Sequence, residues 1–230
     1  MAPTPTAQPG LRERKKQRTR ELIAETARRL FDERGFDRVT VAEIARAADV
    51  AEKTVFNYFA TKEDLVYWRL EAFEGELLAA IRERPPGESA LAAFARFVLA
   101  ERGWLAEKDP EIRKGYMAVS RMIAESPALL AREQQVFERY TASLAALLAE
   151  ETAADDGDIA PWVAANALMG VHRALVHYTR RRVVEGARHP RLAGEVRAQA
   201  EQALALLDQG LGGYAVKDPS HTPDAAASRA

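Results

Sequence analysis

The chain has 230 residues, which is enough for one large domain or for a small domain joined to a medium one. It contains no cysteine, which excludes a disulfide framework and thiolate chemistry and is typical of proteins from the reducing cytoplasm. No apolar run approaches the roughly 18 residues that a membrane span needs. We therefore expect a cytoplasmic protein that does not insert into a membrane.

Helix-forming residues dominate the whole sequence. Ala, Leu, Glu and Arg recur throughout, whereas β-branched runs and glycine clusters are scarce. We predict an all-α fold with an N-terminal three-helix domain over residues 14–61 and a larger C-terminal helical bundle domain over residues 62–213. Residues 1–13 are expected to form a flexible arm, because the first ten are rich in Pro, Thr and Ala. Residues 214–230 are expected to form a disordered tail, because this stretch is polar and rich in Pro and Ala.

The first predicted helix covers about residues 14–34, where apolar residues recur at helical spacing. Gly35 suits a left-handed helix cap, which would let Phe36 fold back onto Phe31.

Two short helices with a tight turn between them are predicted over residues 40–58. The stretch Thr40-Val41-Ala42-Glu43 has the spacing of a capping box and should start the first of them. Asp49 suits the turn, because Asp tolerates a left-handed backbone better than most residues other than glycine. The second short helix should begin near Ala51 and carry polar residues at its start.

This pattern is that of a helix-turn-helix, whose second helix lies in the major groove of DNA. A helix pair with a short turn also occurs in bundles that do not bind DNA, so the pattern alone leaves DNA binding open. A basic stretch before the first helix favours DNA, since it suits phosphates or the adjacent minor groove. It contains Arg12, Arg14, Lys15, Lys16, Arg18 and Arg20 against one acidic residue, Glu13.

Residues 27–65 resemble the N-terminal DNA-binding domain of the TetR family of transcriptional regulators. The resemblance rests on Leu-Phe followed by Glu-Arg-Gly-Phe, then Thr-Val-x-x-Ile-Ala, Val-x-x-x-Thr-Val-Phe-x-Tyr-Phe and Lys-Glu-Asp-Leu. Two residues depart from the family's usual pattern: Asp49 stands where glycine is common, and Ala51 where Ser or Thr caps the recognition helix. A missing cap weakens a helix by about 1 kcal/mol.

The resemblance implies which side chains meet double-stranded DNA. Four residues of the recognition helix are assigned to the groove, with Lys53 suited to guanine and Asn57 to adenine or a phosphate: Glu52, Lys53, Thr54 and Asn57. Phosphate or backbone contacts are assigned to Lys15, Lys16, Arg18, Thr40, Tyr58 and Lys62. For Glu52 simple solvation is the alternative, and for Tyr58 simple packing. Phe56 and Phe59 are expected to belong to the aromatic core, with stacking on bases as the alternative.

After the break at Arg84-Pro85-Pro86-Gly87 the pattern stays helical. The helices expected in the larger domain cover about residues 62–84, 89–106, 110–125, 128–151, 160–184 and 191–210.

Large apolar and aromatic side chains crowd the middle of this domain. They form either an ordinary core or a pocket for a small effector, which would be lined by Phe97, Trp104, Tyr116, Met117, Arg121, Phe137, Met169 and His172. The stretch Arg121–Leu129 is similar to one in TetR-like regulators that respond to acyl-CoA-like or other lipophilic molecules. Methionine suits such ligands because it adapts its shape at little cost.

The last two helices form the dimer in the resembling family. Their length and apolar faces predict the same two-fold, four-helix packing here, with Trp162, Leu168, Leu175, Leu204 and Leu207 at the interface.

Neither a metal site nor an enzyme is expected. The four histidines lack the spacing of paired ligands, no cofactor-binding motif is present, and no phosphate loop or nucleophile motif occurs. The function predicted is a dimeric repressor on a palindromic operator that a small effector releases. Two alternatives remain open at this point: a DNA-binding regulator controlled by a protein partner, and a helical binding protein with a vestigial DNA-binding domain.

Overall fold

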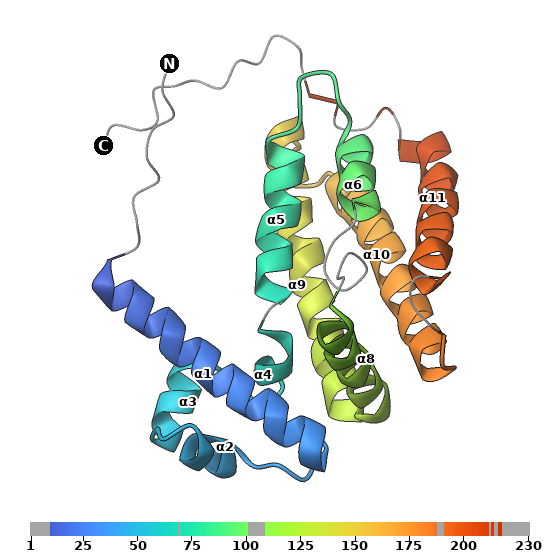
Figure 1. Ribbon diagram of the computed structural model, residues 1–230. Coiled ribbons are helices and arrows are strands. Elements are labelled where there is room, and N and C mark those ends of the chain that lie inside the picture. The colour runs from blue at the N-terminus through green and yellow to red at the C-terminus, as the bar shows by residue number, and fades with distance from the viewer. Residues whose placement is uncertain are drawn as a thin grey trace, which may run out of the picture. The chain divides into compact units, whose positions relative to one another are not determined.

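A computed structural model describes residues 10–68, 70–100, 109–187, 191–211, 213 and 216–217. Within these residues the regular elements are helices, apart from one isolated β-bridge (Figure 1). The all-α prediction is confirmed. The chain divides into two compact units, with the boundary in the sequence between residues 69 and 70, and each unit is described by itself.

The N-terminal unit contains α1 (Leu11–Arg34), α2 (Val41–Ala47), α3 (Glu52–Tyr58) and α4 (Asp64–Tyr67). The first helix starts three residues earlier than predicted, because the N–H of Arg14 already donates to the carbonyl of Gly10 at 3.0 Å. Residues 11–13 of the predicted arm are therefore helical, and residues 1–9 lie outside the described part of the chain.

The core of this unit joins all four helices. Ile23 and Ala27 of α1, Ile44 of α2 and Leu65 of α4 are buried in it. Gly35 ends α1 with φ +81°, and the rings of Phe31 and Phe36 lie 5.1 Å apart, which confirms the predicted fold-back.

The helix predicted over residues 62–84 is divided into α4 and α5 (Leu70–Arg82), with Arg69 outside the described residues. The division has a physical reason, because the two halves serve different cores. Leu65 is buried where α4 packs on α1, whereas Leu77 and Ile81 are buried in the core of the larger unit.

The larger unit continues with α6 (Ala90–Leu99), α8 (Pro110–Glu125), α9 (Pro127–Thr152), α10 (Ala160–Val184) and α11 (Arg191–Leu211). The long helices α9 and α10 pack against each other, α5 and α6 pack together, and α11 covers α6 and α10 (Figure 1). Prolines stand in the first turns of α9 and α10, where a missing N–H leaves no bond unmade. None of the described helices is both long and apolar enough to cross a membrane.

Part of the predicted tail is ordered. Val216 forms an antiparallel bridge with Ser89, and the N–H of Lys217 donates to the carbonyl of Glu88 at 3.2 Å. The ammonium of Lys217 donates to the carbonyls of Arg82 and Arg84 at 2.9 and 3.3 Å, so it satisfies groups at the end of α5. The prediction of disorder is wrong for these two residues, and the other residues beyond Gly213 lie outside the described part.

Candidate nucleic-acid interface

The turn between α2 and α3 has a defined hydrogen-bond pattern. Asp49 adopts the left-handed conformation with φ 54°, as its residue type predicts. The N–H of Val50 donates to the carbonyl of Ala45 at 3.0 Å, and the N–H of Asp49 donates to Arg46 at 3.3 Å. This pair of bonds is a Schellman motif. It ends α2 and sets the direction in which α3 leaves.

The start of α2 is held by the predicted capping box. The hydroxyl of Thr40 accepts from the N–H of Glu43 at 3.3 Å, and the carboxylate of Glu43 accepts from the N–H of Thr40 at 2.8 Å. Arg34 at the end of α1 donates to the same carboxylate at 2.8 Å. The bond from the backbone of Thr40, followed by that from Arg34, lowers the pKa of Glu43 to about 2.

Helix α3 presents two different faces. Val55 is only 1% exposed and Phe59 is buried, whereas Glu52, Lys53 and Asn57 are exposed and Thr54 and Tyr58 are half-buried. Ala51 stands at the N-cap of α3 and has no side-chain acceptor, so the first backbone N–H groups of α3 receive no capping hydrogen bond from it. The prediction that Phe56 belongs to the core is wrong. Its side chain is 48% exposed, because it lies one residue past Val55 and therefore on the outer face.

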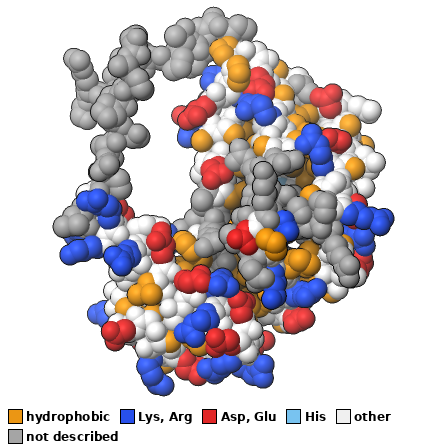
Figure 2. Space-filling view, in the orientation of Figure 1, with side chains coloured by type: hydrophobic (Ala, Val, Ile, Leu, Met, Phe, Trp, Pro, Cys, Tyr) orange, Lys and Arg blue, Asp and Glu red, His pale blue; other side chains and the backbone are white. Residues whose placement is uncertain are grey.

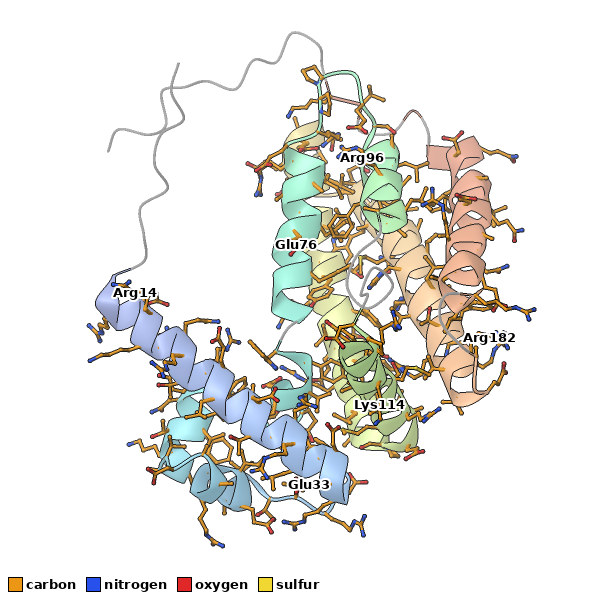
Figure 3. The ribbon with its side chains drawn as sticks, viewed as in Figure 1. Arg14, Glu33, Glu76, Arg96, Lys114 and Arg182 are labelled. Carbon is orange, nitrogen blue, oxygen red and sulfur yellow. The ribbon has the colours of Figure 1, made fainter. Side chains whose placement is uncertain are left out.

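The basic stretch lies on the first turns of α1. Lys15, Lys16 and Arg18 are exposed there, and Figure 2 shows the basic side chains gathered at this end of the helix, near Arg14 in Figure 3. Arg20 follows on the same helix, with its guanidinium 5.5 Å from the centre of the Phe59 ring. That contact holds α1 against the end of α3.

Lys62 is already engaged within the unit. Its ammonium donates to the carbonyls of Phe36 and Val39 at 3.1 and 3.2 Å and lies 4.0 Å from the centre of the Phe36 ring. Lysine has three donors, so these bonds leave one for another acceptor. Lys62 thus fixes the loop that leads into Thr40, and its phosphate contact stays a prediction.

Aromatic side chains of α5, α6, α9 and α10 meet in the larger unit, where Phe97, Phe137 and Tyr140 are buried and Phe73 and His172 are half-buried. The ring of Phe73 stacks on His172 at 4.4 Å and meets Phe97 at 5.3 Å and Tyr140 at 6.0 Å, while Phe137 lies 5.7 Å from His172. Burial lowers the pKa of His172 to about 4, so its imidazole is neutral near pH 7. We call these five residues the aromatic cluster.

The cluster contains three of the predicted pocket residues, and Met169 is buried beside them in the same core. Sequence reasoning missed Phe73, because nothing in the spacing of single helices shows which rings meet across α5, α9 and α10. Tyr116 and Met117 are half-buried on α8, Arg121 is exposed, and Trp104 lies outside the described residues.

A buried ion pair joins α9 and α10 in the larger unit. Arg180 of α10 forms a two-pronged hydrogen-bonded pair with Glu133 of α9, with one bond at 2.8 Å. Both side chains are only 11% exposed. The exposed position of Arg121 removes it from the interior, so its prediction as a polar anchor is wrong.

The predicted dimer residues fall into two groups. Leu168, Leu175 and Leu204 are buried in the core of their own chain, Leu168 with 1% exposure, because they lie on the inward stripes of α10 and α11. Their assignment to an interface is wrong. Leu207 is half-buried, and Trp162 is 51% exposed.

Other apolar side chains stand on the outer faces of these helices: Val163 and Val184 on α10, and Leu206 on α11. An open groove of about 500 Å³ lies between α9 and α10 on the side of Trp162, and Asn166, Arg173 and Arg139 also line it.

The N-terminal unit has the parts of a helix-turn-helix: α2, the left-handed turn at Asp49 and the exposed polar face of α3, beside the basic first turns of α1. These parts are typical of DNA-binding transcriptional regulators of the helix-turn-helix class. Residues 23–67 match the family model of the bacterial regulatory proteins of the tetR family. The chain is 35% identical to the HTH-type transcriptional regulator TcmR of Streptomyces glaucescens over 156 residues, which are 66% of this chain and 69% of TcmR. The chain belongs to the TetR family.

Two solved structures share the fold at low sequence identity. NalD of Pseudomonas aeruginosa, described as the secondary repressor of the MexAB-OprM multidrug efflux pump, is 20% identical with a TM-score of 0.54 and covers 86% of this chain and 97% of its own. SmeT in complex with triclosan is 19% identical with a TM-score of 0.52, covering 90% and 96%. Proteins of this family regulate transcription, and the chain is a regulator and not an enzyme.

Proposed function

We propose that the protein is a repressor that binds a palindromic operator as a dimer and leaves it when a small apolar effector binds. The observation that carries the DNA-binding part is the outer face of α3, where Lys53 and Asn57 are exposed above a buried Val55. A helix of this kind meets base edges with its N-terminal residues. Lys53 pairs well with guanine O6 and N7, and Asn57 with adenine.

The remaining predicted contacts are assigned to the DNA backbone. Lys15, Lys16 and Arg18 on the first turns of α1 provide charges that release counterions from phosphates. Thr40 stands exposed at the start of α2, and Tyr58 and Lys62 are half-buried near the end of α3. These residues set the register of the protein on DNA, whereas Lys53 and Asn57 select the sequence.

The test of this part is selection of bound duplexes from a random pool, followed by affinity measurements at several salt concentrations. We expect enrichment of a palindrome and a steep loss of affinity with salt. Binding that is equally tight for all sequences, or that is insensitive to salt, would contradict the proposal.

Dimer formation is proposed through the outer faces of α10 and α11. Trp162 and Val163 on α10 and Leu206 on α11 are large apolar side chains in solvent, and such groups mark association surfaces when they lie together. A two-fold dimer also agrees with a palindrome, whose half-sites need recognition helices about 34–36 Å apart. Sedimentation should give a dimer at micromolar concentration, and a Trp162→Ala, Leu206→Asp variant should sediment as a monomer.

The effector is proposed to enter at the aromatic cluster. A neutral His172 among aromatic rings suits an apolar molecule that offers at most a hydrogen bond, and it disfavours a cation. The same fold holds triclosan in SmeT, which supports a lipophilic ligand. Of an acyl-CoA-like ligand, only the acyl chain would suit the aromatic cluster. A repressor function is supported by NalD, which shares the fold.

This part is tested by adding long-chain acyl compounds and, separately, aromatic compounds to the protein–operator complex. We expect one class to release DNA and to raise the melting temperature. For a tenfold release the ligand must prefer the DNA-free state by about 1.4 kcal/mol. If neither class does either, the effector part is wrong, while the DNA-binding part is unaffected.

A further inference from the structure

The buried ion pair of the larger unit leaves one strong hydrogen-bond donor unused within the described residues. Arg180 of α10 holds Glu133 of α9 with its two terminal nitrogens, and both side chains are only 11% exposed. The Nε of Arg180 is buried as well, yet its N–H donates to no group of the described residues. Buried donors nearly always have a partner, because a donor without one keeps the full cost of leaving water. This N–H is therefore suited to an acceptor from outside the chain.

The donor lies on the same helix stripe as part of the aromatic cluster. Residues four apart on a helix are neighbours, so His172, Val176 and Arg180 follow one another along one side of α10. On α9, Glu133 likewise neighbours Phe137 of the cluster. A helix rises by about 1.5 Å per residue, which puts the ion pair about 6–12 Å along the helices from the aromatic rings.

The side chains between the rings and the ion pair are apolar and only partly covered. Val176 and His172 are half-buried, as is Phe73 of the cluster. Met117 of α8 is half-buried against the same core. An elongated molecule with an apolar body would cover these side chains, and a polar group at its end would reach Arg180.

The charges of the ion pair decide which polar group fits. Glu133 and Arg180 cancel each other, so the pair as a whole attracts neither an anion nor a cation. A carboxylate would compete with Glu133 for the guanidinium and would leave a buried negative charge without its partner, which is costly. A neutral carbonyl oxygen accepts the Nε–H and leaves the ion pair intact.

We propose that Arg180 selects uncharged apolar effectors that carry a carbonyl oxygen at one end, by donating its Nε–H to that oxygen. This inference rests on the proposed function, since it needs the effector to lie at the aromatic cluster. It narrows the class of effector, because it favours ketones and esters over hydrocarbons and over free acids.

The experiment compares para-acetylbiphenyl with para-isopropylbiphenyl, in which a methyl group takes the place of the carbonyl oxygen. Dissociation constants for the full-length protein are measured by equilibrium dialysis. The wild type should bind the ketone about tenfold more tightly than the hydrocarbon, as expected of a hydrogen bond from a charged donor. Biphenyl para-carboxylate, which has the same rings and a negative charge, should bind more weakly than the ketone.

Arg180→Lys tests the assigned donor, because lysine has a methylene group where arginine has Nε. The variant keeps a cation opposite Glu133 and should bind the ketone and the hydrocarbon equally, the latter as tightly as the wild type does. The matched control is Arg173→Lys, which changes an exposed arginine of the same helix and should retain the tenfold preference.

Melting temperatures show whether the variants are folded. If Arg180→Lys is not, Glu133→Met combined with Arg180→Met takes its place, since a buried pair replaced by apolar side chains of similar volume often keeps its stability. This double variant should also bind the ketone and the hydrocarbon equally.

Equal binding of the ketone and the hydrocarbon by the wild type overturns the inference. Tighter binding of the carboxylate than of the ketone overturns it too, as does a preference for the ketone that survives in the folded Arg180 variant. These results leave the effector at the aromatic cluster and show that the ion pair only joins α9 and α10. If the wild type binds none of the three compounds, the inference and the proposed effector site fail together, whereas operator binding is unaffected.

Discussion

Inside each of the two units, the stabilising contacts have a different range along the sequence. In the N-terminal unit the ion pairs link residues close in sequence, such as Arg28 with Glu25 and Asp32, and they lie at the surface. The larger unit has local surface pairs as well, such as Arg197 with Glu201, but in addition it has ion pairs that bridge helices far apart in sequence. Glu133 binds Arg180, and the buried Arg84 binds Glu151 at 2.6 Å.

This difference explains which unit can be understood from local patterns. In the N-terminal unit the helix ends and the turn depend on bonds that span three to five residues, as at Thr40 and Asp49, although Lys62 also bonds to Phe36 and Val39 farther back. The larger unit depends on which helices come together, as Figure 3 shows for the side chains between α5, α9 and α10. Mutations should therefore act locally in the first unit and cooperatively in the second.

The largest effect is expected from breaking the buried pair of the larger unit. Glu133→Ala leaves the Arg180 guanidinium buried without its counter-charge, and removal of one partner of such a pair costs about 3 kcal/mol or more. Urea denaturation measures the loss. The matched control is Glu201→Ala, whose partner Arg197 is exposed, and it should change stability by less than about 0.5 kcal/mol. Equal effects of the two variants would remove the contrast between buried and surface pairs.

The DNA-contacting residues divide between sequence selection and general attraction. Lys53→Ala should reduce the preference for the operator over unrelated DNA by about 1–3 kcal/mol for each half-site. Lys15→Ala combined with Lys16→Ala removes four lysines from the dimer, so it should weaken binding to both kinds of DNA and reduce the slope of log affinity against log salt by about 4. Salt titrations on both duplexes check this. Proportional losses in both variants would show that the division of roles is wrong.

Acid should destabilise the two units in different pH ranges. The pKa of His172 is lowered to about 4, so the unfolded chain takes up a proton first, and stability falls as the pH drops from about 6.5 to 4. The pKa of Glu43 is lowered to about 2, so its contribution is present above its ordinary pKa near 4.5 and is lost between there and 2.

Melting temperatures across pH test both ranges. His172→Gln should flatten the upper range, and Glu43→Gln the lower one. A His172→Gln profile identical to the wild type would show that the imidazole is not buried as neutral histidine.

The smallest effect concerns the uncapped start of α3. Ala51→Ser supplies the missing acceptor and should stabilise the N-terminal unit by about 1 kcal/mol. Thr40→Ala, which removes the cap of α2, should have the opposite sign and similar size. Thermal unfolding measures both. An Ala51→Ser variant without added stability would indicate that water already satisfies the amides at this helix start.

Sequence alone was sufficient for the class of fold, the helix-turn-helix and the family, because these depend on short-range bonds. The Thr40 cap, the left-handed Asp49 and the contact of Phe31 with Phe36 each involve residues no more than five apart.

Only the tertiary structure decided which faces meet. It placed Phe56 in solvent, moved Leu168, Leu175 and Leu204 from the predicted interface to the core, and brought Phe73 to His172. It also brought the ammonium of Lys217 to the carbonyl of Arg84, which lies just past the end of α5 and 133 residues earlier in the sequence. Periodicity shows that a helix has an apolar stripe, but the partner of that stripe depends on the packing of all the helices together, which no local pattern contains.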